Sequence, residues 1–491
     1  MTQPHFQLYI DGEFCDGSTG TCADSVNPAT GENWASFACT SPQDVDRAIA
    51  AAVRAQDDPE WRDMTQTQRG KLLYRLADLI QDHAANLGRL ETMDSGKLLA
   101  ETAAQTGYVA DYYRYYAGLA DKIEGAVLPI DKPDMHVFTS RMPIGVVAAV
   151  VPWNAQMFLT ATKLGPALAA GCSVILKASE IAPVPMLEFA KLIDQAGFPK
   201  GVVSVITGDA ENCAIPLTRD PRIDRIAFTG GPETARHVVR NSAENFAVTT
   251  LELGGKSPIL VFDDADVDSA ANGLIAANFG ASGQSCVAGS RGLVHRSILG
   301  KLIETIREKS AGIIVGDPLA SQTHMGPLCT RAQIDKITAT LNTAKTQGGV
   351  VHFGGTPLDQ AGNYMPPTLV ECPSHTIATL DVEMFGPVMS LVPFDTEDEA
   401  IAMANCTEFG LGSGVFTQNL ARAHRVSKRI RSGICWINTY RAISPIAPFG
   451  GLNQSGYGRE AGQEAILDYT RTKTTWINTS DSPMANPFVM R

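Results

Sequence analysis

A series of short apolar runs that alternate with helical stretches constrains the fold of this chain more than any other feature. Residues 144–151 form a continuous apolar run rich in valine, which is typical of a strand buried on both faces. We expect further strands at 173–177, 202–207 and 225–229, with helices at 157–170, 183–195 and 233–241. This order predicts a doubly wound α/β fold with a parallel sheet, in which ligands bind beyond the carboxyl ends of the strands.

Three other regions complete the predicted architecture. A second alternating series runs from about residue 258 to about residue 438 and predicts another α/β unit. Before the first series, the sequence predicts a hairpin near residues 6–12 and helices that include 67–90 and 100–120. Segment 121–141 interrupts the first series and is typical of an extended arm, and 469–477 is expected to be a strand.

The composition limits the possible partners and compartments. The 491 residues carry a formal net charge of -12 with no dominant basic patch, which argues against nucleic-acid and anionic-membrane partners. The 10 cysteines are scattered without zinc-site spacing, so we expect no metal and free thiols in a reducing cytoplasm. No signal peptide is visible, and the most apolar stretches are shorter than the roughly 20 residues that a membrane span requires.

Cys286 is the strongest candidate for a reactive group. Gly283 and Gly289 flank it, and such small residues let substrate and backbone approach the sulfur. A thiol acts as a nucleophile when its pKa is low or a base is near, and Glu252 precedes Cys286 in a motif that supplies a carboxylate. For the cysteine taken alone, a buried and inert side chain is the alternative interpretation.

Four residues that follow strands of the first series are candidates for a nucleotide site. Gly230 and Gly231 lie between a strand and a helix, where they would bring the helix N-terminus close to a pyrophosphate. Lys177 and Glu180 follow another strand end and are placed to hold ribose hydroxyls. No GxGxxG sequence follows a strand, so a plain turn and ordinary surface charges are the alternative interpretations.

An ordered set of motifs extends over nearly the whole chain and resembles the aldehyde dehydrogenase superfamily, in its NAD(P)-dependent and non-acylating branch. The resemblance covers residues 27–460. The motifs are Pro152-Trp153-Asn154, Lys163-Leu164-Gly165-Pro166-Ala167-Leu168, Lys177-Ala178-Ser179-Glu180, Phe228-Thr229-Gly230-Gly231, Leu251-Glu252-Leu253-Gly254-Gly255-Lys256, Gly283-Gln284-Ser285-Cys286, Glu383-Met384-Phe385-Gly386-Pro387 and Pro448-Phe449-Gly450-Gly451.

The resemblance implies covalent catalysis by Cys286, which attacks the aldehyde to give a thiohemiacetal and then a thioester. The Asn154 amide and the Cys286 backbone N–H stabilise the oxyanion, and Glu252 activates the water that hydrolyses the thioester. Lys163 and Glu460 match positions of a proton relay. Taken singly, these residues have ordinary structural explanations such as a turn, a helix-face charge or a local ion pair.

The resemblance also implies a cofactor site for NAD, with NADP as an alternative. Lys177 and Glu180 match contacts to the adenosine ribose, Glu383 matches a contact to the nicotinamide ribose, and Phe385 matches a residue beside the nicotinamide. Trp153, Gly230, Gly231 and Leu253 complete the expected cofactor-binding residues.

Several positions depart from the family pattern and indicate the kind of aldehyde. Ala155-Gln156 stands where Phe-Pro is frequent, and Thr162, Gly280 and Ile443 stand where aromatic residues are frequent; Asn453 stands where a lysine is common. These changes predict a wider and more polar tunnel lined by Thr162 and Phe449. Arg441 is expected to face an anionic group of the substrate, with a solvated surface arginine as the alternative. A bulkier, polar or acidic aldehyde is therefore expected.

The resemblance assigns a function to each predicted unit. Residues 1–120 and 142–254 form an NAD-binding domain, 255–468 a catalytic domain, and 121–141 with 469–491 a small β oligomerisation arm that joins a partner in a homodimer or homotetramer. Two alternatives stay open. A CoA-acylating semialdehyde dehydrogenase typically lacks the base that Glu252 supplies, and a non-catalytic structural homologue can lose the catalytic residues that are present here.

Overall fold

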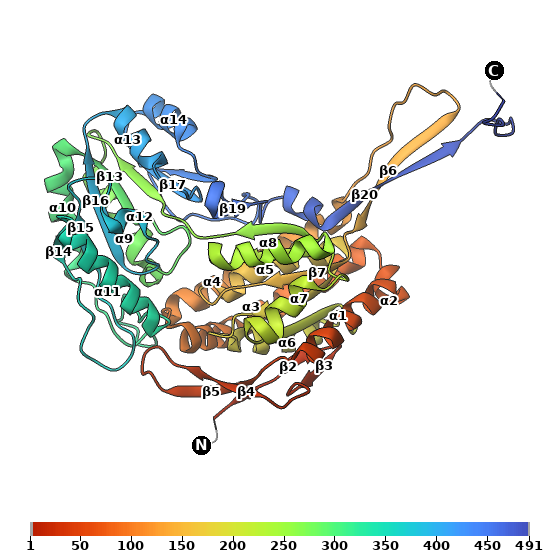
Figure 1. The fold of residues 1–491 in the computed structure, drawn as a ribbon, viewed down its shortest axis with the longest axis horizontal. Helices are drawn as coiled ribbons and strands as arrows, with labels where there is room; N and C mark the ends of the chain where they lie inside the picture. The colour runs from red at the N-terminus through yellow and green to blue at the C-terminus, as the bar shows by residue number, and fades with distance from the viewer. Residues whose placement is uncertain (1–2, 490–491) are drawn as a thin grey trace.

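The computed structural model describes residues 3–489 and has an α/β fold built on two large sheets (Figure 1). The first sheet has eight strands, of which the central five are parallel, as the sequence predicts. Its strands, in spatial order, are β19 (Gly456–Tyr457), β11 (Val248–Glu252), β10 (Arg225–Thr229), β7 (Val146–Val150), β8 (Ser173–Ala178), β9 (Val203–Thr207), β2 (Leu8–Ile10) and β3 (Glu13–Cys15).

Helices cover both faces of the first sheet, and several begin or end where the sequence indicates. Ser41 and Asp44 form a capping box at the start of α1, and Gly171 ends α5 in a left-handed conformation with φ 94°. The helices are α1 (Pro42–Asp57), α2 (Pro59–Arg62), α3 (Gln66–Ser95), α4 (Leu99–Leu119), α5 (Gln156–Ala170), α6 (Val184–Ala196), α7 (Ile215–Arg219) and α8 (Pro232–Asn245), with short turns η1 (Ala120–Lys122) and η2 (Ala210–Ala214).

The second sheet has seven strands and confirms the second α/β unit. All its pairings are parallel except that of β14 with β15. Its strands, in spatial order, are β14 (Val350–Phe353), β15 (Thr368–Glu371), β16 (Val388–Phe394), β13 (Arg291–His295), β12 (Pro258–Val261), β17 (Gly412–Phe416) and β18 (Ile434–Ile437). The helices are α9 (Val267–Phe279), α10 (Arg296–Ser310), α11 (Arg331–Thr346), α12 (Ala378–Asp381), α13 (Glu397–Asn405) and α14 (Leu420–Arg429).

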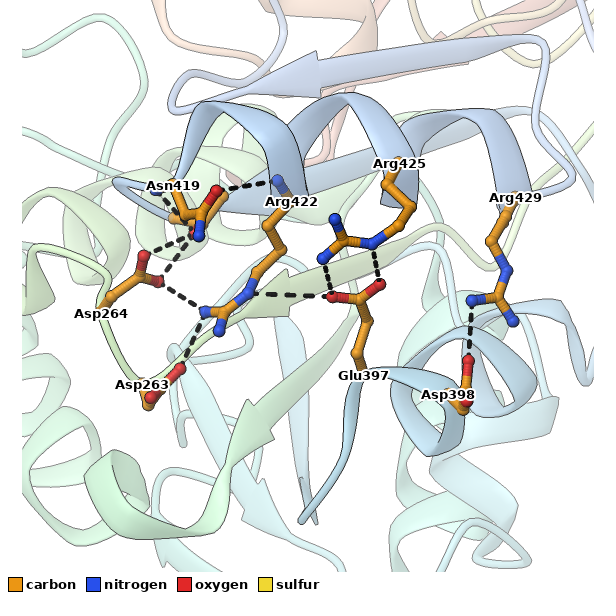
Figure 2. A network of polar contacts seen from close by, with 9 residues as sticks. Asp263, Asp264, Glu397, Asp398, Asn419, Arg422, Arg425 and Arg429 are labelled. Atoms are coloured by element: carbon orange, nitrogen blue, oxygen red, sulfur yellow. Dashed lines mark hydrogen bonds and ion pairs between the residues drawn. The ribbon is translucent and has the colours of Figure 1, made fainter.

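Three arginines of α14 form ion pairs with acidic residues of neighbouring segments in the second unit (Figure 2). Arg422 reaches Asp263 and Asp264 beyond the end of β12 at 2.8 and 2.9 Å. One turn apart along the helix, Arg425 binds Glu397 of α13 at 2.7 Å and Arg429 lies 2.7 Å from Asp398. Exposed ion pairs contribute little singly, but Arg422 and Arg425 share Glu397 and so form a network, while Ala423 and Val426 are the residues of α14 that are buried.

A two-stranded arm projects from the body of the molecule, as Figure 1 shows. It pairs β6 (Met135–Pro143) with β20 (Thr470–Asn478) in antiparallel register, which confirms the expected strand near the C-terminus. A separate small sheet near the N-terminus contains β1 (His5–Phe6), β5 (Asn33–Ala38) and β4 (Cys22–Val26). Within residues 3–489, no helix combines the length and apolar character needed to cross a membrane.

The segment between β18 and β20 differs from the sequence-based boundary. The sequence assigned residues up to 468 to the second unit, but β19 adds to the edge of the first sheet beside β11. Ala461, Ile466 and Tyr469 lie in the hydrophobic core of the first unit. The turns η4 (Asn453–Ser455) and η5 (Glu464–Tyr469) belong to this returning segment, which the local sequence could not assign because its contacts are long-range.

Candidate active site

Cys286 lies on a loop between α9 and β13, which we call the nucleophile loop (residues 280–289). The loop begins with the turn η3 (Gly280–Gly283), where Ala281 and Ser282 adopt left-handed φ values of 52° and 53°. Such values are uncommon for residues other than glycine. Gly283 also has a positive φ of 71°, and a Cβ there would overlap the Gly386 backbone. A glycine at position 283, three residues before the cysteine, is therefore required by close backbone contact.

The Cys286 thiol is the meeting point of two cavities. Its pKa is raised to about 12, first by burial and then by the Glu252 and Glu383 carboxylates, while the Arg441 guanidinium acts in the opposite direction. Asn154 and Leu159 line both cavities together with Cys286. Cys286 thus borders both cavities, which distinguishes it from a cysteine packed entirely inside the core.

One cavity, of about 330 Å³, leads to the sulfur from the α4 side. Asn154 lies at its inner end, where Nδ2 donates a hydrogen bond to the Gln284 carbonyl oxygen at 3.1 Å. Phe449 and Arg441, two predicted substrate-side residues, lie in its wall. The remaining lining residues are Lys97, Glu101, Gln105, Ala155, Phe158, Leu159, Ala281, Gln284, Ser285, Val287 and Ile443.

On the other side of the sulfur, two cavities of about 210 and 410 Å³ share Pro152, Trp153, Thr229, Gly230 and Gly231 in their walls. Together they extend from Cys286 across the carboxyl ends of β7, β8 and β10, where a parallel sheet binds ligands. Leu253, Glu383 and Phe385 line the part near the sulfur, and Lys177 and Glu180 the distant part.

These residues fit a dinucleotide. Gly231 caps the N-terminus of α8 without a side-chain cap, and a Cβ at this glycine would meet open space. The free N–H groups there suit a phosphate. Lys177 Nζ lies 2.6 Å from Glu180 Oε2, so both groups reach the same end of the cavity. Trp153 and Phe385 meet edge to face with ring centroids 5.5 Å apart near the sulfur.

Glu252 is the last residue of β11 and lies beside the cavity that contains the sulfur. Neither of its carboxylate oxygens has a hydrogen-bond partner among residues 3–489. Burial and then the Glu460 carboxylate raise the pKa of Glu252 well above its ordinary value. A buried carboxylate with two free oxygens and a raised pKa has the properties of a general base.

Lys163 and Glu460 form a buried ion pair behind this base. Lys163 Nζ contacts Glu460 Oε1 and lies 2.6 Å from Thr229 Oγ1. The structure thus brings together the two residues that the sequence proposed as a relay. Thr162, which we expected to line the tunnel, lies outside the lining; its hydroxyl is 2.7 Å from Glu460 Oε2, so it faces the ion pair.

Gly280 also differs from the expectation that it widens the tunnel. A Cβ at residue 280 would lie 2.7 Å from Arg441 Nη1, so the guanidinium fills the space that the glycine leaves. Arg441 Nη1 donates to the Ala276 carbonyl oxygen at 3.2 Å, and the residue has a positive φ of 62°. The missing side chain therefore makes room for a cation rather than for a bulky substrate.

The sequence did not single out Lys97, Glu101 and Gln105, which line the outer part of the substrate-side cavity. They lie at and before the start of α4, where charged and polar residues are common. Only the spacing of Glu101 and Gln105, four residues apart on α4, could have indicated a shared role. Within residues 3–489, no cluster of three or more metal-ligating side chains is present.

Comparison with known proteins identifies relatives over the full length of the chain. The model of the aldehyde dehydrogenase family matches residues 14–475. The (Z)-2-((N-methylformamido)methylene)-5-hydroxybutyrolactone dehydrogenase of Acinetobacter baylyi is 56% identical over 487 residues, which is 99% of each chain.

Solved structures agree with this match. PnpE from Pseudomonas sp. WBC-3, in complex with nicotinamide adenine dinucleotide, is similar with a TM-score of 0.95 and 42% identity over 99% of this chain and 100% of that one. Betaine aldehyde dehydrogenase from Staphylococcus aureus in complex with NAD+ has a TM-score of 0.96 and 35% identity over 99% and 97% of the two chains. The resemblance seen in the motifs and the predicted fold class are confirmed, and the chain belongs to the aldehyde dehydrogenase family.

Proposed function

We propose that this protein oxidises an aldehyde to the free carboxylic acid with NAD+ as the electron acceptor. One observation carries the proposal: Cys286 lies between a substrate-side cavity and the two adjoining cavities that fit a dinucleotide, and the unpartnered Glu252 carboxylate belongs to the wall nearest the cysteine. NAD+ was found in solved relatives that share this fold, and it supplies the hydride acceptor when bound.

Each residue around the sulfur has its own role in the proposed reaction. The Cys286 sulfur adds to the carbonyl carbon as the thiolate, and the Asn154 amide with the Cys286 backbone N–H stabilises the resulting oxyanion. Loss of hydride from this carbon leaves a thioester on Cys286. Glu252 then removes a proton from water, whose oxygen attacks the thioester carbon and releases the acid and the thiolate. Lys163 and Glu460 are placed to carry the proton away from Glu252.

Turnover with a panel of aldehydes tests this function. NADH is expected to form with at least one of them, and CoA is expected to leave the product a free acid, because Glu252 supplies the base for hydrolysis. A CoA thioester product would favour the acylating alternative. Absence of NADH with every aldehyde would favour the non-catalytic alternative.

We predict that the enzyme prefers NAD+ to NADP+. Glu180 lines the cavity end expected to hold the adenosine ribose, where its carboxylate would accept hydrogen bonds from the hydroxyls and repel a 2′-phosphate. The ratio of kcat/KM with NAD+ to kcat/KM with NADP+ measures this preference. Glu180→Gln should lower this ratio by roughly tenfold. Glu188→Gln, an acid on α6 outside this cavity, is the control. A wild-type preference for NADP+ would contradict the assignment.

The substrate is proposed to be a polar aldehyde that carries a carboxylate. The relative from Acinetobacter baylyi acts, by its name, on a 5-hydroxybutyrolactone. A lactone of this type is the ring-closed form of an aldehyde with a carboxylate at the far end of its carbon chain. Arg441 lies in the cavity wall and has no carboxylate partner among residues 3–489. It is therefore available for an anionic substrate group.

Removing this guanidinium tests the substrate proposal. In Arg441→Ala, KM for an acidic aldehyde such as 4-oxobutanoate should rise roughly tenfold or more while kcat changes little, because a charge-assisted contact is lost. Arg441→Lys keeps the charge and should recover part of the affinity. A neutral aldehyde of equal size should be nearly unaffected, and an equal effect on both aldehydes would contradict the proposal.

The oligomeric state, the roles of the two α/β units and the cellular location are also part of this proposal. The β6–β20 arm presents an exposed strand edge of the kind that proteins usually cover, which supports a homodimer or homotetramer. The assignment of cofactor and catalytic roles to the two α/β units rests on the cavities between them. A cytoplasmic location remains a prediction from the free cysteines.

A further inference from the structure

We infer that Glu101 has two roles: one carboxylate oxygen positions the nucleophile loop, and the other accepts a hydrogen bond from a hydroxyl group of the substrate. The inference rests on the proposed function and deepens it, since it names a positioning and specificity-determining residue and the substrate class that this residue selects. Glu101 lies in the first turn of α4 and lines the substrate-side cavity together with Cys286.

The first oxygen supports the turn that leads to the nucleophile. Glu101 Oε1 accepts a hydrogen bond from the Ala281 backbone N–H at 3.2 Å, across 180 residues of sequence. Ala281 and Ser282 both have left-handed φ values, so this turn needs support from outside itself. On the other side, the Ser282 hydroxyl donates to the Gly326 carbonyl oxygen at 2.8 Å. Glu101 thus accepts one of the two hydrogen bonds that connect Ala281 and Ser282 of this turn to other segments.

The second oxygen is free. Glu101 Oε2 is buried and has no hydrogen-bond partner among the residues that the structure describes. Burying a carboxylate oxygen without a donor is unfavourable, and such groups in native proteins have a reason. Because Glu101 is part of the wall of a cavity that ends at the Cys286 sulfur, a donor on the substrate is the partner that fits.

The neighbours of Glu101 decide the kind of donor. The Arg441 guanidinium lies against Gly280, the residue that precedes Ala281, so a cation lies beside the turn that Glu101 contacts. Lys97 lines the same cavity and donates to Glu91 and Gln105, both at 2.9 Å. The Arg441 cation disfavours an ammonium group on the substrate, whereas the Lys97 cation is already paired with Glu91. A neutral hydroxyl on an aldehyde that also bears a carboxylate satisfies Glu101 and Arg441 together.

A matched pair of aldehydes tests the second role. We expect the wild type to favour 2-hydroxy-5-oxopentanoate over 5-oxopentanoate in kcat/KM by roughly tenfold. Glu101→Gln keeps an oxygen for the Ala281 N–H but presents an amide NH2 to the cavity, which can only donate to the hydroxyl oxygen, so a neutral hydrogen bond replaces the stronger charge-assisted one. This variant should retain kcat and lose most of the preference, through a higher KM for the hydroxylated aldehyde alone.

Removing the whole side chain tests the first role. Glu101→Ala should lower kcat for both aldehydes. It should also slow the alkylation of Cys286 by iodoacetamide, which mass spectrometry of the Cys286 peptide measures. In Glu101→Gln, kcat and the alkylation rate should both stay at the wild-type level. Asp111→Asn, an exposed acid on the same helix, is the control and should behave as the wild type. If the alanine variant does not fold, Glu101→Asp takes its place in the alkylation measurement, because the shorter side chain withdraws the oxygen from the Ala281 N–H and should slow alkylation in the same way.

Three results would overturn the inference while leaving the proposed function intact. The first is a wild-type enzyme that is active but does not prefer the hydroxylated aldehyde. The second is a change of KM in Glu101→Gln that is equal for the two aldehydes. The third is an alkylation rate of Cys286 in Glu101→Ala that equals the wild-type rate. Absence of NADH from every aldehyde with the wild type would instead contradict the proposed function, and the inference with it.

Discussion

Cys286→Ala is expected to reduce aldehyde oxidation by roughly a thousandfold or more while the fold and NAD+ binding are retained. The thiohemiacetal and the thioester both require the sulfur, and none of the other residues that line the two cavities carries a thiol. The side chain removed is small and borders open space, so the loss of packing is slight. Steady-state NADH formation measures activity, and titration of protein fluorescence with NAD+ measures binding.

The control for this change is Cys406→Ala, which removes an exposed thiol far from both cavities. It should keep wild-type activity. Residual turnover of more than a few per cent in a clean preparation of Cys286→Ala would contradict the role of the cysteine as nucleophile.

Glu252→Gln should release a burst of NADH of about one equivalent per active site and then nearly stop. Formation of the thioester requires Cys286 and the cofactor, whereas its hydrolysis requires an activated water. We expect steady-state turnover to fall by roughly 10²–10⁴-fold, which is the usual contribution of a general base. Rapid-mixing absorbance measurements separate the burst from the steady state.

The dependence on pH gives a second measure of the same residue. Glu252 acts as a base only when ionised, and burial raises its pKa, so hydrolysis in the wild type should slow as the pH falls through this raised pKa. The slowing should be absent in Glu252→Gln. Glu464→Gln, at an exposed acid, is the control. A variant with unchanged turnover would exclude Glu252 as the base, and loss of the burst would mean that Glu252 also activates Cys286.

The sequence predicted those parts of the fold that depend on local pattern. The strand at 225–229 has the predicted bounds, because an apolar run buried on both faces is fully determined by its own residues. The helix predicted at 157–170 ends at Ala170 for a similar reason, since the left-handed conformation of the next residue, Gly171, ends it locally. The motifs around Cys286 and Glu252 were informative because each is short and continuous.

The sequence could not predict contacts between distant segments. Thr162 and Gly280 were both expected to widen the tunnel, but one faces Glu460 and the other accommodates the Arg441 guanidinium. Glu101 has the ordinary position of an acid in the first turn of a helix, and its contact with Ala281 exists only in the folded chain. Each of these outcomes depends on which side chain arrives from elsewhere to fill a space.

The strand β19 has a consequence for the order in which the site is completed. It pairs with β11 at Glu252 itself, opposite Gly456, and the Ser455 hydroxyl donates to the Gly254 carbonyl oxygen at 2.7 Å. During translation, Glu252 and Cys286 are therefore synthesised long before β19, the strand that pairs with the edge of β11. A product truncated by a stop codon just before residue 456 would contain the nucleophile and the base, and yet would leave this edge open.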